Sequence, residues 1–378
     1  MKLLKRLLKI TGGLILFLLL IFVVPLIGVG WQCKIWQNVD PTHSALGGVQ
    51  AVPSTLQKTI DTLAEYQRPE DQTYLTLPEW YIVYSADEYA AFIDKNPPSN
   101  FPYFRAIGQY WRSYYGVCAE VQGRYPFNSG YHLTLAVIGG SFTFENLIRG
   151  VYENTVGRLS ELLSSSTLSE EDVYARKVAT EYGNFIHTIP WYEFPYDEKL
   201  NSLWRETSLW GANPIRKWER KLALSMEYGG KSFYARLIKQ GTQSTYAPEK
   251  LEVYAWVDRL PAQVLNKEAD VKKISDMGKE GALISIPRYE AFTQIVPKLV
   301  DQGVAFKQIA GNDEILVTAF AANNQPLTFE NGTFLFSMPV VIDPSRQRIA
   351  VKVAVPSLHL LLKEFTEKEI TLEHLYDY

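Results

Sequence analysis

The chain has 378 residues, of which 47% are hydrophobic and 21% are charged, so it has room for roughly two globular domains of about 150 residues each. Its 38 basic residues nearly balance 41 acidic ones, and a formal net charge of -3 argues against binding to nucleic acid. With only 2 cysteines, the chain is neither a disulfide-rich scaffold nor a cysteine-based metal finger.

The N-terminal segment over 1–36 predicts a basic N-terminus followed by a transmembrane anchor. Four basic residues stand in the first nine positions, and an uncharged apolar run over 12–31 follows them. Twenty helical residues span about 30 Å, the thickness of a bilayer's hydrocarbon core. The run is longer than the core of a cleaved signal peptide, and bulky residues end it. We expect an inner-membrane anchor of the bacterial type, with a cytoplasmic N-terminus and the bulk of the chain extracytoplasmic.

Beyond the anchor, the sequence predicts a linker over 37–54, an all-helical, aromatic-rich domain over 55–245, and an α+β domain over 246–378 with a mainly antiparallel sheet. Apolar residues recur every three or four positions in the helical part, as on the buried face of a helix. Helices are expected over 54–66, from Pro78 onward, and over 101–121, 133–163, 169–187 and 213–240.

The period changes near residue 246, where short β-type runs begin. Strands are expected over 253–257, 282–286, 304–309, 314–321, 333–341 and 348–355, with helices over 287–302 and 357–370. In the last of these runs β-branched residues at 349, 351, 353 and 355 alternate with other types, which predicts a strand with one face in water.

The apolar segment 131–148 has two interpretations. It contains Glu145, whose carboxylate would be costly in a bilayer, so a buried helix of the folded domain is favoured. The alternative is a multi-span membrane protein in which this segment crosses a second time and Glu145 lines a polar path.

The sequence contains no complete catalytic motif. Gly229–Ser232 resembles the end of a phosphate-binding loop but lacks the earlier glycine, and Ser141 lacks the final glycine of a nucleophile elbow. The five histidines have no metal-ligand spacing, so we expect no metal site and no cofactor. Cys33 and Cys118 could form a disulfide in an oxidising compartment, although Cys118 also fits a buried apolar position.

Acidic and basic residues set among aromatic ones are the most unusual local feature. Two carboxylates beside aromatic platforms could process or bind glycans, whereas the ordinary alternative is a charge ladder on a helix face. The candidate catalytic residues are Glu79, Glu145, Glu153 and Glu193. The candidate binding residues are Arg149, Trp191, Tyr192 and Trp80.

The segment 216–239 holds seven basic residues interleaved with aromatic and aliphatic ones. This pattern indicates either a solvated charged face of a core helix or a segment that lies on an anionic membrane surface.

Taken together, the anchor and the incomplete motifs favour a membrane-anchored, extracytoplasmic binding or scaffold protein of the envelope. Its expected partners, besides the membrane, are an envelope protein, a lipid or a glycan, and not nucleic acid. An envelope glycan hydrolase that uses paired glutamates is the alternative, so the sequence leaves open whether the protein is an enzyme.

Overall fold

The computed structural model describes residues 13, 20, 23–34, 52–63, 66–164, 168–242 and 251–378. Residues 23–32 are helical, but most of the expected anchor and most of the expected linker lie outside the described residues. Within the described part of the chain, no helix is both long and apolar enough to cross a membrane.

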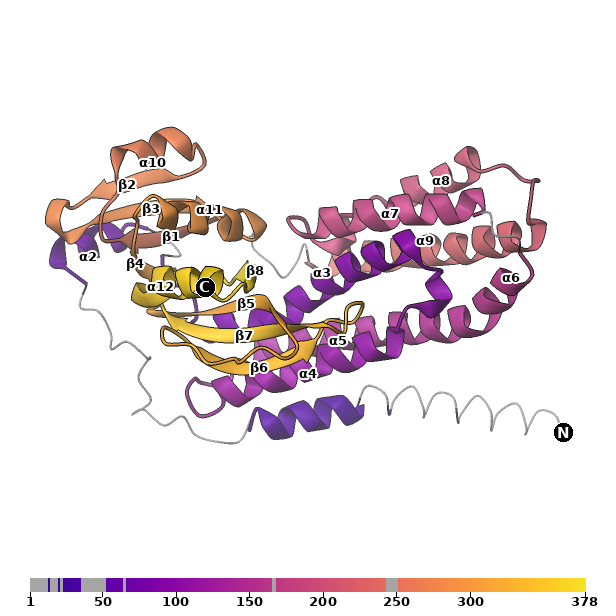
Figure 1. Cartoon of the computed structure of the whole chain (residues 1–378), viewed down its shortest axis with the longest axis horizontal. Helices are drawn as coiled ribbons and strands as arrows, with labels where there is room; N and C mark the ends of the chain where they lie inside the picture. Colours follow the sequence, from indigo (N-terminus) through magenta and orange to yellow (C-terminus); the bar gives the residue numbers. More distant parts are fainter. Residues whose placement is uncertain are drawn as a thin grey trace.

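The N-terminal half of the fold is a bundle of helices that pack along their length (Figure 1). Its helices are α3 (Gln72–Lys95), α4 (Tyr103–Val121), α5 (Ser129–Tyr152), α6 (Arg158–Leu162), α7 (Glu170–Ile186), α8 (Tyr196–Glu206) and α9 (Pro214–Thr242). The short helix α2 (Ser54–Ile60) lies apart from the bundle (Figure 1), with Leu56 packed against Trp256 and Leu283 of the C-terminal part. A turn of π-helix over Glu153–Gly157 joins α5 to α6, and short 3-10 turns precede α4 and α8. The helical region predicted from sequence periodicity is therefore present.

The start of α3 differs from the prediction. The helix begins at Gln72 rather than at Pro78, which lies inside it. The earlier turns hold Tyr74 and Leu75, both fully buried, and the Thr73 hydroxyl accepts a hydrogen bond of 2.9 Å from the amide of Leu316. Tertiary contacts of this first part of the helix outweigh the local cost of an internal proline.

The C-terminal part contains two four-stranded antiparallel sheets, where the sequence suggested one layer. The strands are β1 (Glu252–Val257), β2 (Lys272–Asp276), β3 (Ala282–Pro287), β4 (Phe306–Ile309), β5 (Glu314–Ala322), β6 (Thr333–Pro339), β7 (Arg346–Ala354) and β8 (Thr371–Leu375). The sheet orders are β2-β3-β1-β4 and β6-β7-β5-β8. Helices α10 (Ala262–Lys267), α11 (Glu290–Asp301) and α12 (Leu358–Glu367) accompany them. Sequence patterns did not predict β2 or β8.

Both faces of the second sheet are covered, so the prediction of a water-exposed face on β7 is wrong. Ile349 and Val351 lie in the core that the two sheets share with α11 and α12. Ala350, on the opposite face, packs in a second core with Tyr81 of α3 and Tyr114 of α4. The helices cover the face that alternation alone assigned to water, and the helical region and second sheet form one packed body (Figure 1).

Candidate functional site

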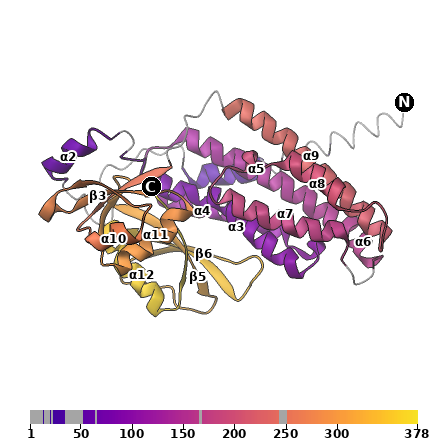
Figure 2. The same cartoon turned by 90° about the horizontal axis from the view of Figure 1, so that it is seen from above.

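The candidate residues of α5 line a seam of charges between α5 and α9, which run side by side (Figure 2). Glu145 accepts from Lys231 at 2.8 Å and lies 3.5 Å from Arg149. Arg149 also lies 3.6 Å from Glu227, and its guanidinium stands 4.3 Å from the centre of the Tyr89 ring. The expected shared face of Glu145 and Arg149 is therefore a contact face with a neighbouring helix.

The same seam continues at Glu153, which accepts from Arg220 at 2.8 Å. Burial raises the pKa of Glu153, and the attraction of Arg220 offsets only part of that effect. At Glu227 the balance is reversed. Burial alone would raise its pKa, but Arg149 and Lys231 together lower it to about 2.

Most cations of the segment 216–239 point into the bundle. The side chains of Arg216, Lys217, Arg220 and Lys221 are at most 4% exposed, and each has a carboxylate oxygen within 3.3 Å. The interpretation of these residues as a solvated or membrane-facing basic surface is therefore wrong for α9. Apart from Glu219 of α9 itself, these carboxylates belong to the first turn of α7, which is distant in sequence, so periodicity could not reveal which face is inside.

The aromatic candidates before α8 lie farther along the seam. Trp191 stacks on Tyr234 of α9, with ring centres 5.3 Å apart, and Tyr192 contacts Trp191 edge to face. Glu193 accepts from Lys239 at 2.8 Å. This group adjoins the Glu145 side of the seam, because the Tyr234 hydroxyl hydrogen-bonds to the hydroxyl of Ser141 on α5 at 2.9 Å.

The remaining candidates, Glu79 and Trp80, lie elsewhere on α3. Glu79 accepts a hydrogen bond of 2.8 Å from the hydroxyl of Tyr131. Trp80 is buried against His374 of β8, with ring centres 3.8 Å apart. The structure thus places six of the eight candidate side chains along the seam, whereas Glu79 contacts α5 and Trp80 lies at the junction of α3 with the second sheet.

That junction also contains a histidine cluster that sequence spacing did not predict. His187, at the end of α7, lies 2.8 Å from Asp87 and 3.3 Å from Glu290 of α11. Its hydrogen bonds to Asp87 and then Glu290 raise the pKa of His187 to about 10. His374 lies on the other side of Trp80, and burial lowers its pKa to about 4. Trp80 thus separates a charged imidazole from a neutral one.

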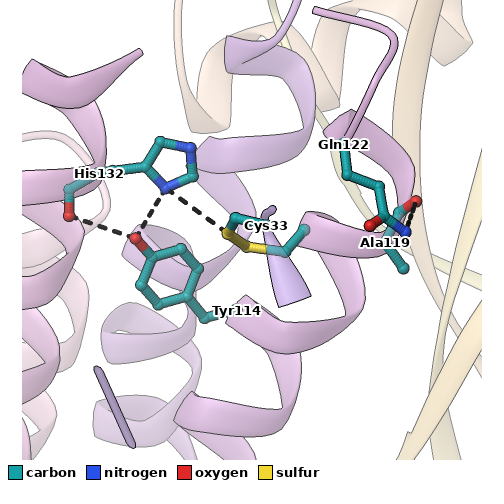
Figure 3. The surroundings of a disulfide bond; sticks show 6 residues. Cys33, Tyr114, Ala119, Gln122 and His132 are labelled. Atoms are coloured by element: carbon teal, nitrogen blue, oxygen red, sulfur yellow. Dashed lines mark hydrogen bonds between the residues drawn. A yellow bond between two sulfur atoms is a disulfide. The ribbon is translucent and has the colours of Figure 1, made fainter. Parts of the chain in front are cut away.

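A disulfide joins Cys33, near the end of the first described helical segment, to Cys118 of α4 (Figure 3). His132 of α5 lies beside it, with Nδ1 3.9 Å from the Cys33 sulfur and 2.8 Å from the Tyr114 hydroxyl. The imidazole stacks on Phe127 at 4.4 Å, and burial lowers its pKa to about 4. A neutral histidine is therefore packed against the sulfur pair.

A cavity of about 20 Å³ adjoins the disulfide and includes Asp71 and His132 in its lining. Such a volume holds about one water molecule and excludes a sugar ring. Among the described residues, Cys33, Cys118 and His132 come closest to a metal-ligand set. The two sulfur atoms are bonded to each other and leave no thiolate to coordinate a metal.

A second, open hollow of about 340 Å³ lies between the start of α4 and the turn that joins α5 to α6. Its polar lining includes Asn100, Arg105, Asn154 and Arg158, and it contains no carboxylate. None of the four candidate glutamates lines either hollow. The four glutamates therefore form ion pairs and hydrogen bonds, and they do not form an open catalytic pair.

Comparison of the chain with protein-family models, with curated proteins and with solved structures finds no match. The function has to be inferred from the residues of this chain.

Proposed function

We propose that the protein is a membrane-anchored, extracytoplasmic binding or scaffold protein of a bacterial-type envelope. The observation that carries this proposal is the Cys33–Cys118 disulfide. Cys33 follows the apolar run over 12–31 by two residues, and Cys118 belongs to the buried core of the helical bundle. A disulfide at this point fastens the end of an anchor to the folded body.

The disulfide also supports an extracytoplasmic position for the folded body. Disulfides persist in oxidising compartments and are rare in a reducing cytosol. The basic residues that precede the apolar run favour a cytoplasmic N-terminus, which puts Cys33 and everything fastened to it on the opposite side. Two independent chemical arguments therefore lead to the same orientation.

Binding is favoured over catalysis because three of the four candidate glutamates form ion pairs with cations of α9. Glu145 and Glu153 are paired with cations of α9, and Glu193 with Lys239. A glycan hydrolase needs one carboxylic acid and one carboxylate facing a shared substrate cleft. The hydrolase remains the alternative. A multi-span protein in which 131–148 crosses the bilayer is less favoured, because α5, which contains this segment, is not apolar enough to cross a membrane.

The test combines cysteine oxidation with topology. The full chain is expressed in a bacterial host, denatured with and without reductant, and treated with a maleimide that adds mass to free thiols. We expect membrane-bound protein that gains mass only after reduction, and Cys33→Ser protein that gains one label without reductant. Free thiols in the unreduced full chain would contradict the proposal.

Reporter fusions after residue 125, after residue 165 and at residue 378 complete the test. All three should report an extracytoplasmic position. A change of side between 125 and 165 would favour the multi-span alternative. Loss of a measured glycan-cleaving activity in Glu145→Gln or Glu153→Gln protein that remains folded would favour the hydrolase.

A further inference from the structure

Helix α5 exposes mainly large apolar side chains along most of its length, and the partly exposed Glu145 is paired with Lys231. After Gly130, every residue of α5 that is exposed to solvent is a large apolar one. These residues are Leu133, Val137, Phe144, Ile148 and Val151, with exposed fractions between 42% and 66%. A helix on the surface of a water-soluble bundle would expose charged and polar residues at these positions.

Helix α9 has the same pattern. From residue 215 to residue 233, every exposed residue is apolar or glycine. The large ones are Ile215, Trp218, Leu222, Met226 and Phe233. Arg216, Lys217, Arg220 and Lys221 occupy buried positions between them. Arg236 and Lys239, beyond this stretch, are exposed. Both helices are thus inverted relative to a soluble amphipathic helix, with charge inside and apolar side chains outside.

The two apolar stripes lie on the same side of the bundle. Pairing of Ser141 with Tyr234, Glu145 with Lys231 and Glu153 with Arg220 makes α5 and α9 antiparallel neighbours. At 100° per residue, the exposed stripe lies about 115° from the seam on α5 and about 140° from it on α9. The buried residues of both helices lie on the other side of the seam, so both stripes face the same side of the bundle.

We call the ten large residues of these stripes the α5–α9 apolar face. Ten side chains that are each about half exposed exceed the few hundred Å² that the largest apolar patch of a soluble monomer usually covers. Neighbouring helices do not share this property. The exposed positions of α8 include Asp197, Glu198 and Asn201, and α7 exposes Lys177 and Asn184. The inversion therefore belongs to one face of the bundle.

One end of this face is bordered by residues that suit lipid headgroups. Trp210 and Trp204 contact Trp218 at 6.3 Å and are 75% and 44% exposed. Arg105 and Arg158 line the open hollow next to the end of α5, in which there is no carboxylate. Tryptophan rings favour the headgroup level of a bilayer, and arginines attract anionic headgroups.

From this arrangement we infer that the α5–α9 apolar face lies on the hydrocarbon surface of a lipid bilayer, with Arg105 and Arg158 directed at anionic headgroups. The inference extends the proposed function, because a body fastened to an anchor at Cys33 is held next to a bilayer. A bilayer fits better than a protein partner because the ten side chains of the face are apolar, whereas protein interfaces carry polar rims and hydrogen bonds. The adjacent Glu145, whose side chain is 39% exposed, is paired with Lys231. The charges beneath it are already paired and need no water.

The inference is tested with single introduced cysteines in the full chain, reconstituted in nanodiscs of phosphatidylcholine and phosphatidylglycerol. The sites on the face are Leu222→Cys and Val151→Cys. Matched control sites on the water-facing helices are Lys177→Cys and Asn201→Cys, and Val24→Cys reports on the anchor. Spin labels are attached without reductant, so that the native disulfide stays closed. Collision rates with oxygen and with a polar nickel complex are then measured.

Labels on the face should collide several-fold more with oxygen than with nickel, because hydrocarbon dissolves oxygen and excludes the polar complex. The control sites should show the reverse. Collision rates like those in water at Leu222 and Val151 would overturn the inference. Low collision rates with both reagents would also overturn it, because they would show that protein covers the face. If Val24 is in lipid while the face is not, the proposed function survives; if Val24 is also in water, both fail. Unchanged circular dichroism shows that each variant is folded.

Discussion

His187 shows how a single side chain links parts of the fold that are distant in sequence. It binds Asp87 of α3 and Glu290 of α11, which lie 100 and 103 positions away. Its folded-state pKa is about 10, compared with 6.5 for a free imidazole. The folded protein therefore keeps a proton that the unfolded chain loses, and the stability gained is complete below pH 6.5 and is lost as the pH rises through 10.

The corresponding prediction concerns His187→Gln. Because the Asp87 side chain is 43% exposed, solvent screens the pair, and we expect a loss of about 1–2 kcal/mol at pH 6. The difference from the wild type should shrink by pH 10. Denaturant unfolding at both pH values measures it, with Asn184→Ala on the same helix as the control. An equal loss at the two pH values would show that the charge of His187 is not what stabilises the fold.

His374 should have the opposite pH dependence. Burial lowers its pKa to about 4, so between pH 6.5 and 4 the unfolded chain binds a proton that the folded protein excludes. Stability is then lost as the pH falls through this window, by up to about 3 kcal/mol. His374→Gln should reduce the difference in unfolding free energy between pH 7 and pH 4.5. An unchanged pH dependence in the variant would mean that His374 does not titrate in the folded protein. The pH dependence that the variant retains should come from His132, whose pKa is also lowered by burial.

At the scale of elements, close packing of α5 on α4 depends on glycines, and Gly139 makes a closer approach than Gly150. A Cβ atom at Gly139 would lie 2.2 Å from a ring carbon of Tyr110 and 3.1 Å from Trp111. Tyr110 is fully buried and cannot move aside easily. Gly139→Ala should therefore destabilise the protein by about 1–3 kcal/mol, in spite of the better helix propensity of alanine.

Gly108, in the exposed part of α4, is the matched control. A Cβ atom there meets nothing within 4 Å, so Gly108→Ala should be neutral or stabilise the protein by up to about 1 kcal/mol. Thermal unfolding of both variants measures the contrast. Equal melting temperatures for the two would contradict the tight α4–α5 contact.

Sequence periodicity predicted most helices and six of the eight strands because local pattern decides which residues form an element. It could not predict which side of an element faces water. The alternation over 348–355 looks half exposed, yet α3 and α4 cover its second face. In α9, the helical period is correct but its charged stripe lies inside. Both errors have the same origin, because burial is decided by partners far away in sequence.

The same reasoning explains the candidate site. Glu145, Arg149 and Glu153 could be placed on one helix face from their spacing of four residues, but their partners on α9 could not be identified. The residues next to Trp80 in sequence make it a candidate, whereas its contact with His374 depends on the second sheet. The histidine cluster has no local signal at all, since it is assembled from α3, α7, α11 and β8.

At the scale of the whole molecule, a buried ion triad joins the helical region to the second sheet. Arg348 of β7 donates to Glu88 of α3 at 3.0 Å and to Glu373 of β8 at 2.7 Å. All three side chains are at most 8% exposed, and the guanidinium also stands 4.4 Å from the ring centre of Tyr84. The triad therefore lies within the core that the two regions share.

Removal of Arg348 would leave two carboxylates buried without their cation, which typically costs about 3–5 kcal/mol. We therefore expect Arg348→Ala to lower the unfolding free energy by this amount. The control, Lys363→Ala, removes an exposed ion pair with Glu367 and should lower the unfolding free energy by less than about 0.5 kcal/mol. Because the triad bridges both regions, hydrogen exchange in the Arg348 variant should lose protection in peptides of α3 and β7 together. Loss of protection in β7 with α3 unchanged would mean that the helical region and the second sheet unfold independently, and that their shared core does not couple them.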